Sequence, residues 1–154
     1  MPHILVCSVF DAFEYCMDHY APFGLEEFAE RKDRYAVISI QDSHTGGFGI
    51  RFCESASCTG ALTLLFDDII RPVDGAVFFS AEHADRIIDF ALAHQDADTI
   101  LVHCYAGESR SRAVGGFLEK LFGAERSRYL DTGSPNEAIL RTLNEQWVLR
   151  SDHL

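Results

Sequence analysis

The chain has 154 residues, of which 47% are hydrophobic and 12% aromatic, enough to fill the core of one ordinary domain and too apolar for a disordered tail. Its formal net charge of −11 disfavours nucleic-acid backbones and anionic membranes as partners. The five cysteines are an odd number in a chain of this size, which favours reduced thiols over a disulfide scaffold.

The N-terminal sequence and the length of the apolar runs indicate the cellular location. The N-terminal residues lack the basic start and long apolar stretch of a signal peptide. No apolar run approaches the roughly 18 residues needed to span a membrane. We therefore expect a single domain over residues 1–154, a cytoplasmic location, and no partner of nucleic acid or membrane.

The N-terminal half predicts two buried strands with helical pieces between them. An apolar run at residues 4–7 suits a buried strand. A short amphipathic piece over residues 25–31 leads to a second strand at residues 35–40, which a polar and glycine-containing loop at residues 42–47 follows. Between the first strand and residue 25, a helical spacing predicts one inward apolar stripe made of Phe10, Phe13, Cys16, Met17 and Tyr20.

The C-terminal half repeats the alternation. A third strand is predicted at residues 61–66, and Ser80 is a suitable cap for the helix after it. A fourth strand at residues 99–102 precedes a helix that should end at Gly123. Strands alternating with helices predict an α/β domain whose central sheet is mainly parallel and flanked by helices.

The start of the last helix has its own signal. Ser134 is a potential cap, Pro135 would occupy the first helical position and Glu137 the third. This order is a capping box, in which the cap and the third helical residue satisfy each other's backbone N–H groups.

The segment from His103 to Ser111 has the features of a phosphate site. It lies between the fourth predicted strand and an amphipathic helix, and a loop that enters a helix offers backbone N–H groups and the positive end of the helix dipole to an anion. Gly107 would let the backbone turn closely around the oxygens, and Arg110 would bind two of them at once. The same positive field favours the thiolate form of Cys104, which is the nucleophilic form.

This segment resembles the cysteine-dependent protein tyrosine phosphatases, a superfamily that includes the dual-specificity phosphatases. Their signature is His-Cys, five residues, Arg, and then Ser or Thr, matched here from His103 to Ser111. The resemblance implies that Cys104 forms a cysteinyl-phosphate, that Ser111 eases departure of its thiolate and that His103 orders the loop. It also implies a substrate-binding loop made of Tyr105, Ala106, Gly107, Glu108, Ser109 and Arg110.

The resemblance calls for an acid that protonates the leaving oxygen, normally an Asp on a loop that follows a strand. Asp68, at the end of the third predicted strand, is the first choice. Asp67 beside it and Asp74 in the next turn remain alternatives. The acid must carry a proton in the first step, so activity should peak on the acidic side of neutral. No metal or other cofactor is needed.

More closely, three pieces look like a compact group of bacterial predicted tyrosine phosphatases: residues 65–69, residues 103–107 and the pair Pro135-Asn136. The function implied is hydrolysis of phosphate monoesters, above all phosphotyrosine in proteins, so the expected partner is a phosphotyrosine protein. In some members a second cysteine protects the nucleophile in a reversible disulfide, for which Cys7 and Cys58 are candidates.

Two alternatives to this function stay open. One is an inactive phosphoprotein-binding module of the same fold. The other is a phosphatase of non-protein esters, such as phosphoinositides or RNA triphosphates, and members that act on these tend to have Lys or His in the loop. This loop has Tyr105, Glu108 and Ser109 instead, which disfavours the second alternative.

Overall fold

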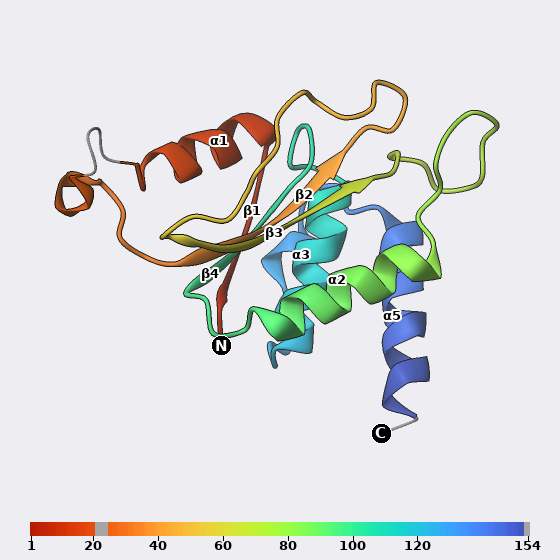
Figure 1. The fold of residues 1–154 in the computed structure, drawn as a ribbon. Helices are drawn as coiled ribbons and strands as arrows, with labels where there is room; N and C mark the ends of the chain where they lie inside the picture. Colours follow the sequence, from red (N-terminus) through yellow and green to blue (C-terminus); the bar gives the residue numbers. More distant parts are fainter. Residues whose placement is uncertain (21–24, 153–154) are drawn as a thin grey trace.

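Four parallel strands form the central sheet of the computed structural model, which describes residues 1–20 and 25–152. Their order is β1-β4-β2-β3, as Figure 1 shows. The strands are β1 (His3–Cys7), β2 (Tyr35–Gln41), β3 (Cys58–Leu65) and β4 (Thr99–His103). All four predicted strands are therefore confirmed.

Helices cover both faces of this sheet (Figure 1). One face packs against α2, α3 and α5 through a large apolar cluster, and the other packs against α1 through a smaller one. The central strands β2 and β4 are buried along their whole length, as expected for strands covered on both faces. The helical segments are α1 (Val9–Met17), η2 (Glu26–Phe28, 3₁₀), α2 (Ala81–Ala93), α3 (Arg110–Leu121), α4 (Arg128–Asp131) and α5 (Glu137–Ser151).

The predicted inward stripe of α1 is wrong. Its buried residues are Val9, Ala12 and Tyr15, whereas Phe10 is 66% exposed and Phe13 is 50% exposed. Helical spacing identifies an apolar stripe but does not say which of two stripes faces the sheet. The buried stripe packs the small Ala12 and the aromatic Tyr15 against the sheet, which leaves Phe10 and Phe13 outside.

Two helix ends match the expectation and one does not. Ser80 caps α2, and Gly123 follows the end of α3 in a left-handed conformation. The last helix, however, is capped by Asn136, whose side-chain oxygen accepts from the N–H groups of Ala138 and Ile139. The predicted cap at Ser134 is therefore two residues too early, because Asn caps a helix as well as Ser does.

None of the helices in residues 1–20 and 25–152 is long and apolar enough to cross a membrane. The C-terminal boundary of the predicted domain over residues 1–154 falls on residues 153–154, which are outside the described residues.

Candidate active site

The loop after β4 is held in place by the strands on either side. His103, the last residue of β4, lies beside Cys7 of β1 and Ser39 of β2. The loop then turns through Gly107, whose φ is +76°. A Cβ atom on Gly107 would lie 2.6 Å from the carbonyl carbon of Cys7, so both the turn and this close approach require glycine. The expectation that Gly107 permits a tight turn agrees with this geometry.

Cys104 and Ser111 meet at the N-terminal end of α3. The Cys104 Sγ lies 3.1 Å from the Ser111 Oγ and accepts a hydrogen bond from the Gly107 N–H at 3.3 Å. Ser111 is fully buried, and Cys104 is 3% exposed. These donors, together with the end of the helix dipole, favour negative charge on the sulfur.

Arg110 is buried and held by two acceptors. Its guanidinium donates to the backbone carbonyl of Phe66 at 2.9 Å and pairs with the Asp42 carboxylate at 2.8 Å. A buried cation needs such partners because desolvation would otherwise be costly. The arrangement fixes the plane of the guanidinium before any phosphate arrives.

Asp42 is a site residue that the sequence reasoning missed, since it assigned residues 42–47 to a loop. A signal was present: Asp42 directly follows β2, the strand that pairs with β4. The carboxyl ends of neighbouring parallel strands meet at one edge of a sheet, where ligands of α/β proteins bind. Asp42 was therefore a candidate for contact with the loop after β4.

His103 orders the loop as a neutral side chain. Its Nδ1 lies 3.0 Å from the Cys104 carbonyl oxygen, which can only accept, so Nδ1 carries the proton. Its Nε2 then accepts from the Ser39 hydroxyl at 2.6 Å, and that hydroxyl accepts from the Gln41 amide. Burial, reinforced by the nearby charge of Arg110, lowers the pKa of His103 below its usual value. The predicted ordering role of His103 is compatible with these contacts.

Of the three candidate acids, Asp68 is the one beside the nucleophile. It lines a pocket of about 260 Å³ together with Cys104 and Arg110. One of its carboxylate oxygens accepts from the Ser109 hydroxyl and from the Asn136 amide, both at 2.8 Å. Asn136 is a second residue whose contact with the site was missed, because the sequence placed it beside a helix cap and in a family-like piece but gave it no contact with Asp68.

The other two candidates are placed differently. Asp67 accepts hydrogen bonds from the N–H groups of Ser43 and Val77 at 2.9 and 2.8 Å, and from the Ser43 hydroxyl. Burial alone would raise its pKa, but these hydrogen bonds outweigh burial and hold the pKa below its usual value. Asp67 is therefore a carboxylate that holds the segments of Ser43 and Val77 together. Asp74 is exposed in the following turn and is not among the described residues that line the pocket.

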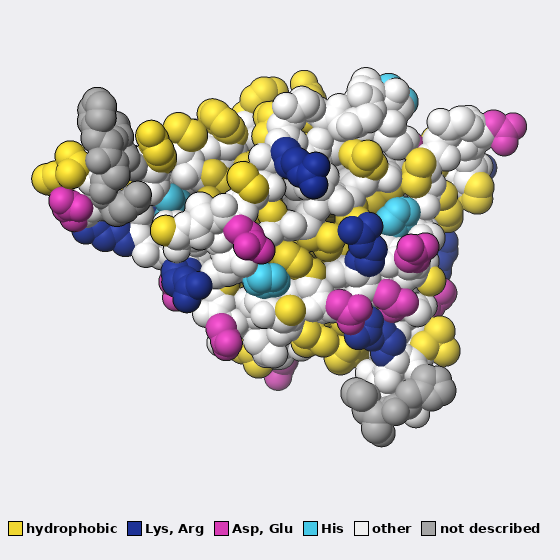
Figure 2. Space-filling view, viewed as in Figure 1, with side chains coloured by type: hydrophobic (Ala, Val, Ile, Leu, Met, Phe, Trp, Pro, Cys, Tyr) yellow, Lys and Arg dark blue, Asp and Glu magenta, His cyan; other side chains and the backbone are white. Residues whose placement is uncertain are grey.

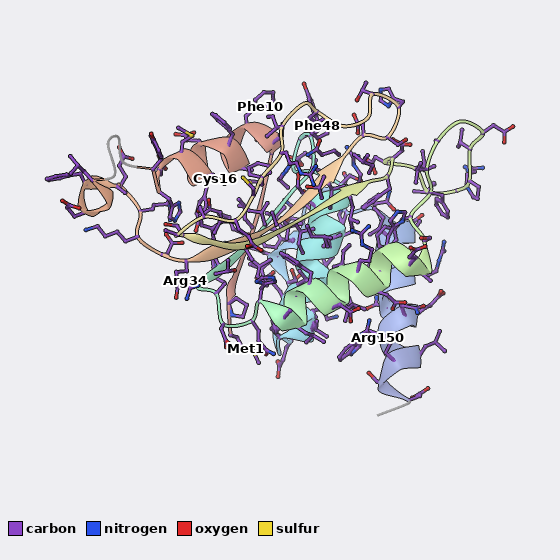
Figure 3. The ribbon with its side chains drawn as sticks, viewed as in Figure 1. Met1, Phe10, Cys16, Arg34, Phe48 and Arg150 are labelled. Carbon is purple, nitrogen blue, oxygen red and sulfur yellow. The ribbon has the colours of Figure 1, made fainter. Side chains whose placement is uncertain are left out.

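Tyr105 is the aromatic residue among the described residues that line the pocket. Tyr105, which is 53% exposed, contacts Phe10 of α1 and Phe48 of the loop after β2, with ring centroids 5.9 and 5.6 Å apart. Figure 3 shows Phe10 and Phe48 at the same edge of the molecule. Ala106, Glu108 and Ser109 complete the lining. Five of the six residues predicted to bind substrate thus line the pocket. The sixth, Gly107, donates its backbone N–H to the Cys104 sulfur.

The two candidate redox cysteines pack on the other side of the sheet from the nucleophile. Cys104 belongs to the cluster with α2, α3 and α5, whereas Cys58 and Cys7 pack in the cluster with α1. Burial raises the pKa of Cys7 to about 12, which keeps this thiol protonated and unreactive. The packing gives no support to a disulfide between either residue and Cys104.

No protein-family model and no curated protein matches the sequence. Solved structures do match. The crystal structure of DUSP15 is 17% identical with a TM-score of 0.58, over 99% of this chain and 88% of that chain. Human DUSP28 is 15% identical with a TM-score of 0.57, over 100% and 97%. PTPMT1 is 16% identical with a TM-score of 0.55, over 99% and 96%.

The chain has the fold of the dual-specificity and tyrosine phosphatases. The expected phosphatase-type α/β fold is thereby confirmed. At this identity the likeness says nothing further, and activity depends on the side chains of the site. PTPMT1 has also been solved in complex with PI(5)P, so the neighbours of this fold include one with a bound lipid phosphate.

Proposed function

We propose that the protein hydrolyses phosphate monoesters through a cysteinyl-phosphate, with phosphotyrosine in proteins as the favoured substrate. One observation carries the proposal: Cys104, Arg110 and Asp68 line a single pocket at the N-terminal end of α3. A nucleophile, an anion-binding guanidinium and a carboxylic acid are the three groups that this reaction requires.

In the first step the Cys104 thiolate attacks phosphorus while the ester P–O bond breaks. Asp68 gives its proton to the leaving oxygen, and Arg110 binds two phosphoryl oxygens. In the second step water attacks phosphorus, the Asp68 carboxylate takes its proton, and the P–S bond breaks. The Ser111 hydroxyl, 3.1 Å from the sulfur, stabilises the departing thiolate. Inorganic phosphate is released and the thiolate is regenerated.

The aromatic mouth of the pocket supports an aryl ester. Tyr105 lines the pocket and is held by edge-to-face contacts with Phe10 and Phe48, so its ring can pack against the phenyl ring of a bound ester. The lining also contains the carboxylates Asp42 and Glu108, which repel a substrate with several phosphates. A phosphoinositide is the alternative substrate to include in the assays.

The test is hydrolysis of a nitrophenyl phosphate, a phosphotyrosine peptide and a phosphoinositide between pH 4 and 8 under reducing conditions. Cys104→Ser should abolish turnover. Asp68→Asn should lower kcat by about 10²–10⁴-fold, the usual contribution of a general acid. Asp74→Asn serves as the matched control and should retain activity, because Asp74 is exposed outside the pocket.

Two results would contradict the proposal. Absence of turnover at every pH, in a folded protein that binds vanadate, would leave a phosphoprotein-binding module. Preferred hydrolysis of the phosphoinositide would replace the substrate class while leaving the mechanism intact.

A further inference from the structure

A second cavity of about 450 Å³ lies on the α1 side of the sheet. Its lining comes from α1 and the segment of residues 50–58 that leads into β3, and includes Tyr35 at the start of β2. It shares none of its lining with the phosphate pocket among the described residues. The apolar part of the lining includes Phe13, Cys16, Met17, Tyr35, Ile50 and Phe52.

The chemistry of this cavity suits an uncharged apolar group. Burial raises the pKa of Cys16 to about 11, so the thiol is neutral and behaves as a small apolar side chain. Arg51 and Glu54 also line the cavity, and their opposite charges leave it without a bias towards either sign. Burial of apolar surface is therefore the main source of affinity available here.

The cavity continues the aromatic surface that begins at the phosphate pocket. Tyr105 contacts Phe10, and Phe13 is about one helical turn further along α1. Both phenylalanines are half exposed or more, and Figure 2 shows hydrophobic side chains gathered over α1. On the inner side, the Phe52 ring packs against His103 with centroids 5.1 Å apart. Phe10 thus lies between Tyr105 of the phosphate pocket and Phe13 of the cavity, and Phe52 connects the cavity to the last residue of β4.

The spacing sets how far along a substrate chain a second contact would lie. The Tyr105 and Phe10 rings are 5.9 Å apart, and one turn of α1 adds about 5 Å. An extended peptide rises about 3.3 Å per residue, so Phe13, the first residue of α1 on the cavity lining, is roughly three residues along such a peptide from Tyr105.

We propose that this cavity binds an apolar side chain of the protein substrate, roughly three residues from the phosphotyrosine, while the phosphate occupies the pocket at Cys104. The inference rests on the proposed function and adds to it a sequence preference. The cavity favours phosphotyrosine segments that carry a large apolar residue at this distance. A small aryl phosphate does not contact the cavity.

The test compares phosphotyrosine peptides that differ at one position. Leu or Gly is placed two, three or four residues from the phosphotyrosine, on either side, and kcat/KM is measured for each peptide. Burial of a leucine side chain should raise kcat/KM about ten-fold for the best-placed Leu peptide over its Gly partner. Phe13→Ala should reduce this ratio to about two. The matched control Phe28→Ala should keep it, because Phe28 is 73% exposed on η2 and does not line the cavity.

A binding measurement separates the cavity from the chemistry. Cys53 is exposed and lines the cavity, so in Cys104→Ser protein the Leu peptide should slow its alkylation by iodoacetamide more than the Gly peptide does. The inference would be overturned by equal kcat/KM for every Leu and Gly pair, or by equal rates of Cys53 alkylation with the Leu and Gly peptides. Hydrolysis of the peptides would still support the proposed function in that case. A dimer that Phe13→Ala dissociates would overturn it too, because a second copy would then cover this face. Failure to hydrolyse any phosphate ester would remove the proposed function and this inference together.

Discussion

Asn136 connects the last helix to the proposed acid, and two substitutions can separate these contributions. Its side-chain oxygen caps α5 through the N–H groups of Ala138 and Ile139. Its side-chain nitrogen donates to Asp68 at 2.8 Å and to the Ile69 carbonyl at 3.1 Å. Asn136→Ala removes both contributions. Asn136→Ser keeps a hydroxyl that can cap the helix but is too short to reach Asp68.

The expected magnitudes follow from these contacts. Loss of a cap costs about 1 kcal/mol, and each lost hydrogen bond of the buried amide costs about 1 kcal/mol net. The Ala variant should therefore lose about 3 kcal/mol of unfolding free energy and the Ser variant about 2 kcal/mol. For a domain of this size, each kcal/mol lowers Tm by about 3 °C. The Ala variant should melt about 9 °C below the wild type and the Ser variant about 6 °C below it.

Activity distinguishes the two contributions more sharply than stability. Both variants should lose kcat by about ten-fold at temperatures where they are folded, because Asp68 keeps only its hydrogen bond from Ser109 and is less well placed to give its proton. The measurements are thermal melts and kcat for an aryl phosphate with a poor leaving group. Wild-type kcat in Asn136→Ser together with a reduced kcat in Asn136→Ala would refute the reasoning, since the helix rather than the amide contact would then govern activity.

Three further predictions concern other parts of the structure. Asp42→Asn should lower kcat/KM for aryl phosphates about ten-fold through loss of the 2.8 Å ion pair that orients Arg110; unchanged steady-state kinetics would contradict this. Gly107→Ala should lower turnover at least about 100-fold, because the φ of +76° and the adjacent backbone exclude a Cβ. Circular dichroism checks that the variant remains folded. Near-normal turnover would contradict the prediction and show that the loop relaxes. Asp33 and Asp67 have a depressed pKa in the folded state, because hydrogen bonds outweigh the opposing effect of burial. The stability that these two carboxylates contribute is therefore fully present above the unfolded pKa of about 3.9. It is lost as pH falls through their folded pKa values. Urea unfolding should show this decline below about pH 4, and Asp33→Asn should make it shallower; an unchanged slope in that variant would contradict the assignment.

The strands and the motif were predictable from the sequence because their signals are local. Short apolar runs mark strands that are buried on both faces, and the order of His103, Cys104, Gly107 and Arg110 is contained in one loop. The signal that Ser80 caps a helix lies within a few neighbouring residues as well. Such features need no knowledge of distant segments.

The choice of a general acid could not be made from local sequence signals. The sequence limited the choice to Asp67, Asp68 and Asp74, and nothing in their neighbours decided among them. Their placement depends on partners distant in the chain: Ser43 and Val77 hold Asp67, whereas Asn136 contacts Asp68 at the pocket. These contacts depend on how β2, β3 and α5 are arranged in space.

By itself the sequence determined the α/β class, the strand-loop-helix unit and the residues that we propose bind an anion in that loop, because periodicity and loop chemistry act between residues close in the chain. Only the tertiary structure decided that Asp42 holds Arg110, and that Phe10 and Phe13 of α1 lie outside while Tyr15 is buried. A helix with two apolar stripes buries the one that fits the sheet, and Ala12 allows the closer fit. Strand order likewise brings Asp42 to Arg110, since parallel pairing aligns the carboxyl ends of strands that are far apart in sequence.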